Sequence, residues 1–380
     1  MNYYEVALKG YFLGALTYES EADIEIYSEV LVELGRKKNV RAIVLKKVPK
    51  PEFSTKTISE ITPKSLSTAQ MELATFISSY YTCKLGFVLS SFESSVFYTP
   101  KPVNIGKAPT LSDKQNEALN FIKKENSSLL FADTGSGKTE IYIALIKEYL
   151  KKGEQVLLFM PEIALTPQMQ KRLSVYFEGA FFMWHSKISK AKKQKALKSL
   201  ENGEILLVAG ARSALFLPFR KLGCIIVDEE HDNSYKASDN PRLNARDLAL
   251  FLSAKVGAKV LLGSATPSVT SFYRQKSFRL KGTFFESQKE FIFDESDLGV
   301  SSMLLRELRT SLRAQKQAIV FLPTRAHFRQ ILCQSCAQTI KCPFCSVPMS
   351  LHKDKNALKC HYCGYAQGIT QICPNCGGSM

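Results

Sequence analysis

The chain has 380 residues, 45% of them hydrophobic and 23% charged, which is enough for two or three domains with ordinary cores. Lysine and arginine outnumber aspartate and glutamate by 51 to 35, so the net charge of +16 suits a polyanionic partner such as nucleic acid, although a solvated basic surface explains the same excess. The N-terminus does not resemble a signal peptide and no run of about 18 apolar residues occurs, so we expect a cytoplasmic protein without membrane contact.

The first 65 residues alternate apolar and polar positions, as in residues 42–45, and glycines interrupt them. Such alternation predicts a small β-rich domain. Between residues 67 and 90 the spacing of apolar side chains predicts one or two helices packed on that domain. Prolines between residues 92 and 110 predict a linker.

A capping box of Ser112 and Gln115 predicts the start of a helix. Beyond it, short apolar strands alternate with amphipathic helices, including a lysine-rich helix over 190–200, which predicts a parallel sheet covered on both faces. The expected strands are 127–133, 155–161, 180–185, 205–210, 223–228 and 258–264. Further on, we expect a helix over 303–315 and the first strand of another α/β unit over 317–322.

The segment from Leu129 to Glu140 is an apolar strand that runs into a glycine-rich turn ending in Gly-Lys-Thr. Small residues let successive backbone N–H groups point into one concavity, and the following helix adds the positive end of its dipole. This predicts a phosphate-binding loop in which Lys138 reaches the β- and γ-phosphates of ATP and Thr139 binds Mg²⁺. Further nucleotide contacts are expected from Thr134, Gly135, Ser136, Gly137 and Gln115.

A second apolar strand, 222–227, ends in Asp228 and Glu229, at the edge where a parallel sheet gathers its active site. We expect Asp228 to hold Mg²⁺ through water and to contact the nucleotide, and Glu229 to orient or deprotonate the attacking water. An acidic loop that only closes a buried strand is the alternative. Because a phosphate loop lies upstream, the two motifs together predict an NTPase.

Three more strand ends carry hydroxyl, small or basic residues. Ser264, Ala265 and Thr266 are expected to sense the nucleotide through the acidic motif. The loops 161–168 and 210–214 suit the sugar-phosphate backbone of a nucleic acid, with Arg212 and Ser213 as the expected contacts. A surface ion pair is the alternative role of Arg212.

Eight of the ten cysteines form four C-x-x-C pairs near the end of the chain. They are Cys333, Cys336, Cys342, Cys345, Cys360, Cys363, Cys373 and Cys376. Each pair offers two thiolates to a tetrahedral ion, so the block predicts two closed Cys₄ zinc sites, and the spacing leaves three ways of pairing open. Iron-sulfur or redox use are alternatives, and His352 or His361 could replace a cysteine ligand.

Together these motifs resemble the PriA family of bacterial replication-restart helicases, also called primosomal protein N′, in helicase superfamily 2. The matching stretches are 132–140, 161–168, 210–218, 225–236, 244–247, 263–268 and the cysteine block, with a weaker likeness over 80–86. The resemblance implies an ATP-driven 3′-to-5′ DNA helicase that acts in primosome assembly at stalled forks and D-loops. It also implies ATP, Mg²⁺ and two Zn²⁺ as cofactors, and DNA single strands, other primosome proteins and single-strand-binding protein as partners.

The implied fold class is α/β: a RecA-like helicase lobe after a small β-rich domain that binds DNA 3′ ends, and before the start of a second lobe with a zinc-binding insertion. The expected boundaries are 1–95 for the β-rich domain with its helices, 96–110 for the linker, 111–285 for lobe 1, 286–332 for the start of lobe 2 and 333–380 for the zinc module. By resemblance, the outer cysteine pairs share one zinc and the inner pairs the other.

The sequence departs from the family pattern in three places. The linker has no room for the family's winged-helix domain, residues 239–244 lack the family's aromatic residues, and the arginine motif of the second lobe does not occur. We therefore expect an N-terminal fragment of such a helicase. A DNA- and zinc-binding primosome assembly factor without helicase activity is one alternative function, and another superfamily 2 translocase, such as an RNA helicase, is a second that would not account for the cysteines.

Overall fold

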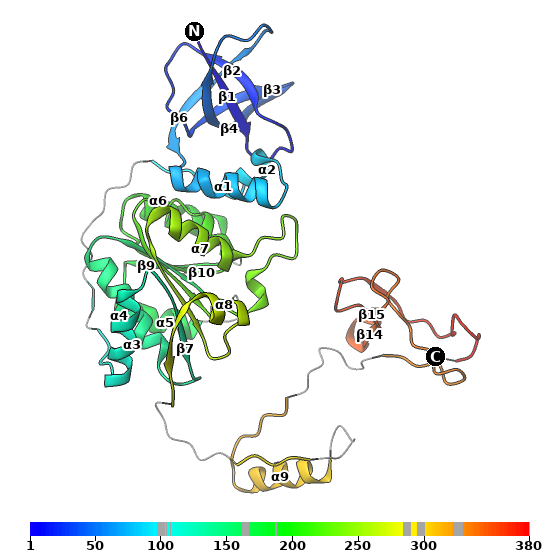
Figure 1. Cartoon of the computed structure of the whole chain (residues 1–380). Coiled ribbons are helices and arrows are strands. Elements are labelled where there is room, and N and C mark those ends of the chain that lie inside the picture. The colour runs from blue at the N-terminus through cyan, green and yellow to red at the C-terminus, as the bar shows by residue number, and fades with distance from the viewer. Residues whose placement is uncertain are drawn as a thin grey trace. The chain divides into compact units, whose positions relative to one another are not determined.

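A computed structural model gives the positions of residues 1–96, 103, 105–106, 108–161, 167–186, 188–283, 290–294, 301–321 and 330–379. Two compact units make up the chain, Met1–Ser287 and Gln288–Met380 (Figure 1). Most of the expected linker and residues 162–166 of the expected loop 161–168 lie outside the described residues.

The N-terminal residues form a six-stranded sheet, as the alternating sequence predicts. Its strands are β1 (Asn2–Leu8), β2 (Leu16–Ser20), β3 (Ser28–Leu34), β4 (Lys37–Val48), β5 (Lys56–Thr57) and β6 (Glu60–Ser65), in the order β5-β2-β1-β4-β3-β6. Successive side chains of a strand point to opposite faces. Tyr4, Val6 and Leu8 therefore enter the core of this domain, whereas Ala7 and Ile43 face the helices that follow.

Two helices, α1 (Thr68–Tyr80) and α2 (Leu85–Leu89), lie between this sheet and the larger lobe (Figure 1). Ile77 of α1 is fully buried in a core to which both the sheet and the lobe contribute. Phe76, on the same helix, stacks on Phe251 of the lobe with ring centroids 4.1 Å apart. A hydrophobic junction thus joins the N-terminal domain to the lobe.

The larger lobe has a seven-stranded parallel sheet with helices on both faces, which confirms the predicted fold class. Its strands are β7 (Ser127–Ala132), β8 (Gln155–Phe159), β9 (Phe181–Trp184), β10 (Leu207–Gly210), β11 (Leu222–Asp228), β12 (Lys259–Ser264) and β13 (Lys276–Leu280), in the order β13-β7-β12-β11-β8-β10-β9. The helices are α3 (Asp113–Lys124), α4 (Lys138–Lys151), α5 (Pro167–Phe177), α6 (Lys190–Glu201), α7 (Ala245–Val256) and α8 (Val269–Arg274), with 3₁₀ turns η2 (Arg212–Phe216) and η3 (Asn233–Tyr235). Helices α3, α4 and α5 pack on one face of this sheet and share a hydrophobic core with it. Helices α6 and α7 pack in the same way on the opposite face.

The edge strand β13 is an element that the sequence analysis missed. It runs parallel to β7, with Phe278 opposite Leu130. Only Leu280 of this strand is buried, because one side of an edge strand faces water. Its sequence, Lys-Ser-Phe-Arg-Leu, therefore lacks the continuous apolar run that marks the inner strands.

The second unit contains α9 (Ser302–Arg313), close to the helix expected over 303–315, and a cysteine-rich module. The strand expected over 317–322 is wrong for residues 317–321, while Leu322 lies outside the described residues. Ile319 there is 95% exposed, and a strand needs a neighbour to pair with. The module carries β14 (Ser350–His352), η4 (Lys353–Lys355), β15 (Ala357–Lys359) and β16 (Ala366–Gly368). Throughout the described ranges, every helix is too short or too polar to cross a membrane.

Candidate nucleotide site and zinc clusters

The predicted phosphate loop connects β7 to α4. Gly135 and Gly137 have φ values of 79° and 88°, in the left-handed region that glycine adopts without strain. Gly137 is also the N-cap residue of α4, so the loop leads directly into the positive end of a helix. A β-carbon at Gly137 would come within 2.1 Å of the amide nitrogen of Gln115, so the Gln115 side chain would have to move, in addition to the strain that the positive φ would impose.

Beside this loop lies a cavity of about 520 Å³, within the size range of small-molecule sites. It is lined by Thr110, Gln115, Gly135, Gly137, Lys138, Thr139, Glu140 and Arg172. Arg172 reaches it from α5 and pairs with Glu140. The sequence analysis missed Thr110, Glu140 and Arg172, because only the packing of α5 and the start of α3 next to α4 brings them together.

Gln115 is the residue that ties helix α3 to the phosphate loop. Its Oε1 accepts a hydrogen bond from the Ser112 backbone N–H at 2.8 Å, which completes the predicted capping box. Its Nε2 donates to the Ser136 carbonyl at 3.1 Å. The same side chain therefore caps a helix, holds the loop and lines the cavity.

Lys138, Asp228 and Glu229 come together at the carboxyl ends of the strands. Lys138 Nζ lies 2.9 Å from Glu229 Oε1. Tyr142 donates a hydrogen bond to Asp228 Oδ1 at 2.9 Å. Burial raises the pKa of Asp228, and the charge of Lys138 opposes that effect. A carboxylate enclosed in this way beside a phosphate loop fits a divalent cation, whose charge would offset the cost of burial.

The expected sensing residues adjoin the acidic motif, because β12 pairs with β11 and sets Gly263 opposite Asp228. His231 joins the two strand ends. Its Nδ1 lies 2.8 Å from Ser264 Oγ, and its Nε2 lies 3.4 Å from Thr266 Oγ1. The same ring is 3.7 Å from Glu229 Oε2. The sequence analysis gave His231 no role, since its partners come from a strand more than 30 residues away. Ala265 lies between the two hydroxyl residues in the chain.

Arg212 and Ser213 begin the turn η2 after β10, and three strands separate β10 from β7, the strand that leads into the phosphate loop. Arg212 contributes to a second hollow of about 260 Å³. The other lining residues are Met160, Ala211, Ser234, Tyr235, Lys236 and Ser238. Tyr235 connects this hollow to the acidic motif, because its hydroxyl donates to the Asp228 carbonyl at 2.5 Å.

The eight cysteines form two clusters in a nested arrangement. Cys333, Cys336, Cys373 and Cys376 make the outer cluster, and Cys342, Cys345, Cys360 and Cys363 the inner one; in each, the sulfur atoms lie within 4.8 Å of one another. Sulfur separations of 3.5 to 3.7 Å far exceed a disulfide bond of about 2.05 Å. They are close to the sulfur–sulfur distance in a tetrahedral ZnS₄ site, which is about 3.8 Å for Zn–S bonds of about 2.3 Å. Both clusters therefore fit a tetrahedral zinc ion.

The four cysteine pairs share one turn conformation. The residue directly after each second cysteine has a positive φ: 55° at Ala337, 56° at Ser346, 82° at Gly364 and 73° at Gly377. This turn brings both thiolates of a pair to one side. The two histidines that could have replaced a cysteine, His352 and His361, instead contact each other, with their Nε2 atoms 3.1 Å apart.

Comparisons with known proteins agree with this geometry. A family profile described as DEAD/DEAH box helicase matches residues 112–274. The profile "3'DNA-binding domain (3'BD)" matches residues 5–92, and "PriA DNA helicase Cys-rich region (CRR) domain" matches residues 342–367. The lobe is thus a helicase-type nucleotide-binding lobe. Nucleotide use and zinc binding follow from these matches and the two thiolate clusters.

The chain belongs to the PriA family. It is 47% identical to the replication restart protein PriA of Helicobacter pylori strain 26695 over 368 residues, which covers 95% of this chain and 59% of that protein. It is 35% identical to the PriA protein of Rickettsia felis, which covers 90% of this chain and 56% of the relative. The chain therefore spans less than two thirds of these relatives.

Solved structures show a weaker likeness. The helicase MrfA, in a structure titled as bound to DNA and AMPPNP, has a TM-score of 0.43 and 17% sequence identity. The superposition covers 61% of this chain and 38% of that one.

Proposed function

We propose that this chain provides the nucleotide site and the DNA 3′-end-binding domain of an ATP-dependent 3′-to-5′ DNA helicase that acts in replication restart. The observation that supports this most strongly is the convergence of Lys138, Asp228 and Glu229 beside a phosphate loop, in a chain of the PriA family. A separate match to a 3′ DNA-binding domain precedes this lobe. The site is therefore an ATPase coupled to DNA.

In this proposal each residue of the loop binds a different part of the nucleotide. The backbone N–H groups of Thr134 to Gly137 bind the phosphates, together with the N-terminus of α4. Lys138 neutralises charge on the β- and γ-phosphates, and Thr139 directs its hydroxyl to the metal ion. The cavity between Gln115 and Arg172 accommodates the rest of the nucleotide.

Glu229 is the group that we assign to the attacking water. In the structure it pairs with Lys138, so its carboxylate is occupied. Once Lys138 turns to the phosphates, Glu229 is free to orient the water and accept its proton. The ion pair with Lys138 thus prevents Glu229 from acting as a general base until nucleotide binds. Asp228 would hold Mg²⁺, and the ion, when bound, would offset the charge that develops on the phosphates.

For the second unit, the proposed role of the cysteine clusters is structural. Each Cys₄ cluster holds one structural Zn²⁺, with the outer and inner cysteine pairs used separately. Closed Cys₄ sites have no open ligand position, so we assign them no chemistry.

The proposed DNA contacts lie in two places. The N-terminal domain takes the 3′ end of a strand, and Arg212 with Ser213 contacts the sugar-phosphate backbone beside the hollow of Lys236. Forks and D-loops are the substrates that family membership suggests, with other primosome proteins and single-strand-binding protein as partners. A chromosomal substrate of this kind places the protein in the cytoplasm.

The test is ATP hydrolysis by the 380-residue chain with and without forked DNA that carries a free 3′ end. Lys138→Ala should abolish nucleotide binding, and Glu229→Gln should lower kcat by about 10²- to 10⁴-fold while nucleotide still binds. Lys151→Ala, at the exposed end of the same helix, is the matched control and should behave as the parent chain.

The outcomes separate the candidate functions. DNA-stimulated turnover that both site variants lose supports the helicase. Fork binding without any turnover would instead indicate a DNA- and zinc-binding assembly factor. Equal stimulation by RNA and DNA would point to a different superfamily 2 translocase.

A further inference from the structure

The hydroxyl of Tyr81 joins the N-terminal domain to the catalytic lobe by a direct polar contact. Tyr81 is the C-cap residue of α1, and its hydroxyl accepts a hydrogen bond from the Asn244 backbone N–H at 3.1 Å. Asn244 is the N-cap residue of α7, and its side chain accepts a hydrogen bond from the Arg246 backbone N–H at 3.2 Å. The N-terminal domain therefore holds the residue that starts a helix of the lobe.

The next contact leads from this helix to the acidic motif. Arg246 Nη1 lies 3.0 Å from Glu230 Oε2, and the Glu230 side chain is fully buried. Glu230 follows the proposed general base directly in sequence. Its backbone N–H also donates to the Gly263 carbonyl at 3.1 Å, on the strand that ends in the sensing residues. A shift of Arg246 would therefore act on both strand ends of the nucleotide site.

Glu230 has further partners that make this position rigid. Its Oε1 accepts from the Ser268 backbone N–H at 2.6 Å, and its Oε2 accepts from the Ser271 hydroxyl at 2.7 Å. Arg246 itself bonds Ser268 Oγ at 3.2 Å. A buried carboxylate with every oxygen bonded tolerates little displacement, because an unpaired buried charge costs several kcal/mol.

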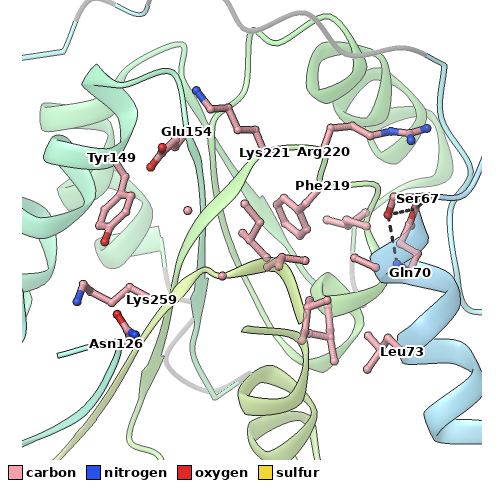
Figure 2. Close-up of a pocket in the computed structure, with 18 residues that line it drawn as sticks. Ser67, Gln70, Leu73, Asn126, Tyr149, Glu154, Phe219, Arg220, Lys221 and Lys259 are labelled. Atoms are coloured by element: carbon pink, nitrogen blue, oxygen red, sulfur yellow. Dashed lines mark hydrogen bonds between the residues drawn. The ribbon is translucent and has the colours of Figure 1, made fainter. Parts of the chain in front are cut away.

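The chain just before the start of α1 is fixed to the lobe as well. Arg220 donates from Nη2 to the Ser65 and Ser95 carbonyls at 3.2 and 3.1 Å, and from Nε to Ser95 Oγ at 3.1 Å. Figure 2 shows Arg220 and Phe219 on the lobe facing Ser67 and Gln70 at the start of α1. Arg220 lies two residues before β11, the strand that ends in Asp228. The junction thus meets the lobe at two points, and both lead to the acidic motif.

We propose that Tyr81 and Arg246 are positioning residues that couple DNA binding at the N-terminal domain to nucleotide binding at the phosphate loop. The path is Tyr81, Asn244, Arg246 and Glu230. This inference rests on the proposed function, because it takes DNA and ATP as the two ligands. A purely structural role would hold α7 in place without making either affinity depend on the other ligand.

The test measures coupling instead of turnover, with the full chain. The Kd of a fluorescent, non-hydrolysable ATP analogue is measured without DNA and with a saturating oligonucleotide that has a free 3′ hydroxyl. The ratio of the two Kd values is the coupling, and we expect about fivefold or more for the parent chain. By linkage, the nucleotide must change the DNA affinity by the same factor, which provides an internal check.

Tyr81→Phe removes one hydroxyl and keeps the ring. We expect the ratio to fall below about twofold, while each ligand alone binds with nearly its parent affinity. Tyr80→Phe is the matched control, since Tyr80 is adjacent and 69% exposed, and it should leave the ratio unchanged. Arg246→Lys keeps the charge but loses the fork geometry, so it should reduce the ratio in part.

Three results would overturn the inference. An unchanged ratio in Tyr81→Phe would show that coupling takes another path. A ratio of one in the parent chain, with both ligands bound, would remove the coupling and leave the proposed function intact. Failure of the parent chain to bind nucleotide or DNA would overturn the proposed function and this inference with it.

Discussion

The carboxylate of Asp133 binds the guanidinium of Arg279, with Oδ1 and Nη2 2.5 Å apart. Asp133 directly precedes the glycine turn of the phosphate loop, and Arg279 lies on the edge strand β13. Asp133 Oδ2 also accepts the Gly282 backbone N–H at 2.9 Å. The hydrogen bond from Arg279, with that from Gly282, lowers the pKa of Asp133. These contacts hold the start of the phosphate loop against the edge strand β13.

Loss of this contact should loosen the phosphate loop. We expect Arg279→Gln to weaken nucleotide binding by about two- to fivefold, the range for a partly exposed ion pair. Isothermal titration with a non-hydrolysable ATP analogue measures it. Lys276→Gln is the control, because Lys276 lies on the same strand but pairs with Glu125. An equal loss of nucleotide affinity in both variants would show that the ion pair with Asp133 has no specific effect and that only the stability of β13 is important.

Asp228→Asn should make the nucleotide-free protein more stable while it abolishes hydrolysis. Burial raises the pKa of Asp228, so the folded state favours the neutral carboxyl, and ionisation costs stability as pH rises above about 4. Removing that charge should raise the Tm of the lobe by about 2 to 4 °C at pH 7, equal to roughly 1 kcal/mol. Calorimetry without nucleotide measures it.

The gain of Asp228→Asn should shrink as the pH falls through the raised pKa of the parent carboxyl, because the folded parent protein then takes up the proton that removes the buried charge. Asp239→Asn, at an exposed position in the same region, should leave the Tm unchanged. A lower Tm in Asp228→Asn at pH 7 would mean that the attraction of Lys138 outweighs the cost of burial.

Zinc content should report the nested pairing directly. Cys336→Ser with Cys376→Ser alters one cluster and should remove one zinc ion per chain, whereas Cys336→Ser with Cys345→Ser alters both and should remove two. Atomic emission on dialysed protein measures the content. If the second pair of substitutions removed only one ion, the neighbouring cysteine pairs would share a zinc and the nested arrangement would be refuted.

The N-terminal domain should lose stability in acid through Glu29. This carboxylate is buried with Lys9, and its Oε2 lies 3.2 Å from Lys9 Nζ and accepts a hydrogen bond from Ser94 Oγ at 2.7 Å. Burial alone would raise its pKa, but Lys9, Ser94 and Arg41 outweigh that effect and lower it. Stability that is present above about pH 4 should therefore be lost as the pH falls through the lowered pKa.

Glu29→Gln should remove much of this acid dependence and destabilise the domain by about 3 kcal/mol at pH 7, because Lys9 is left buried without its counter-charge. Hydrogen exchange of the β1 to β4 amides measures both effects. Glu33→Gln, on the same strand at a more exposed position, is the control. An unchanged acid dependence in Glu29→Gln would assign it to other carboxylates.

The sequence predicts those parts of the site that are local in the chain. The phosphate loop, the acidic motif and the cysteine pairs each place their chemistry within a few residues, and the strand and helix around Leu129 to Glu140 follow from apolar spacing. All six expected strands of the lobe occur in the structure. Local patterns therefore suffice for the fold class and for the candidate residues.

Contacts across the fold could not be predicted in this way. Tyr81 and Asn244 are separated by 163 residues, and only the packing of α1 on α7 brings them together. Arg279 lies on β13, which could not be recognised as a strand because its sequence is largely polar. The strand expected over 317–321 was wrong because the apolar run there has no strand to pair with in the described residues. The pairing of the cysteines likewise depends on how the chain folds back, since each spacing fits several arrangements.

The nested cysteine clusters also fix an order of assembly during synthesis. The inner cluster is complete once Cys363 has left the ribosome, whereas the outer one waits for Cys376. Cys333 and Cys336 therefore emerge first but bind their ion last, and until then their thiolates are open to oxidation. An ion bound in the inner cluster would shorten that interval, because it would already hold the intervening chain in a compact loop and so lower the entropy cost of the final closure.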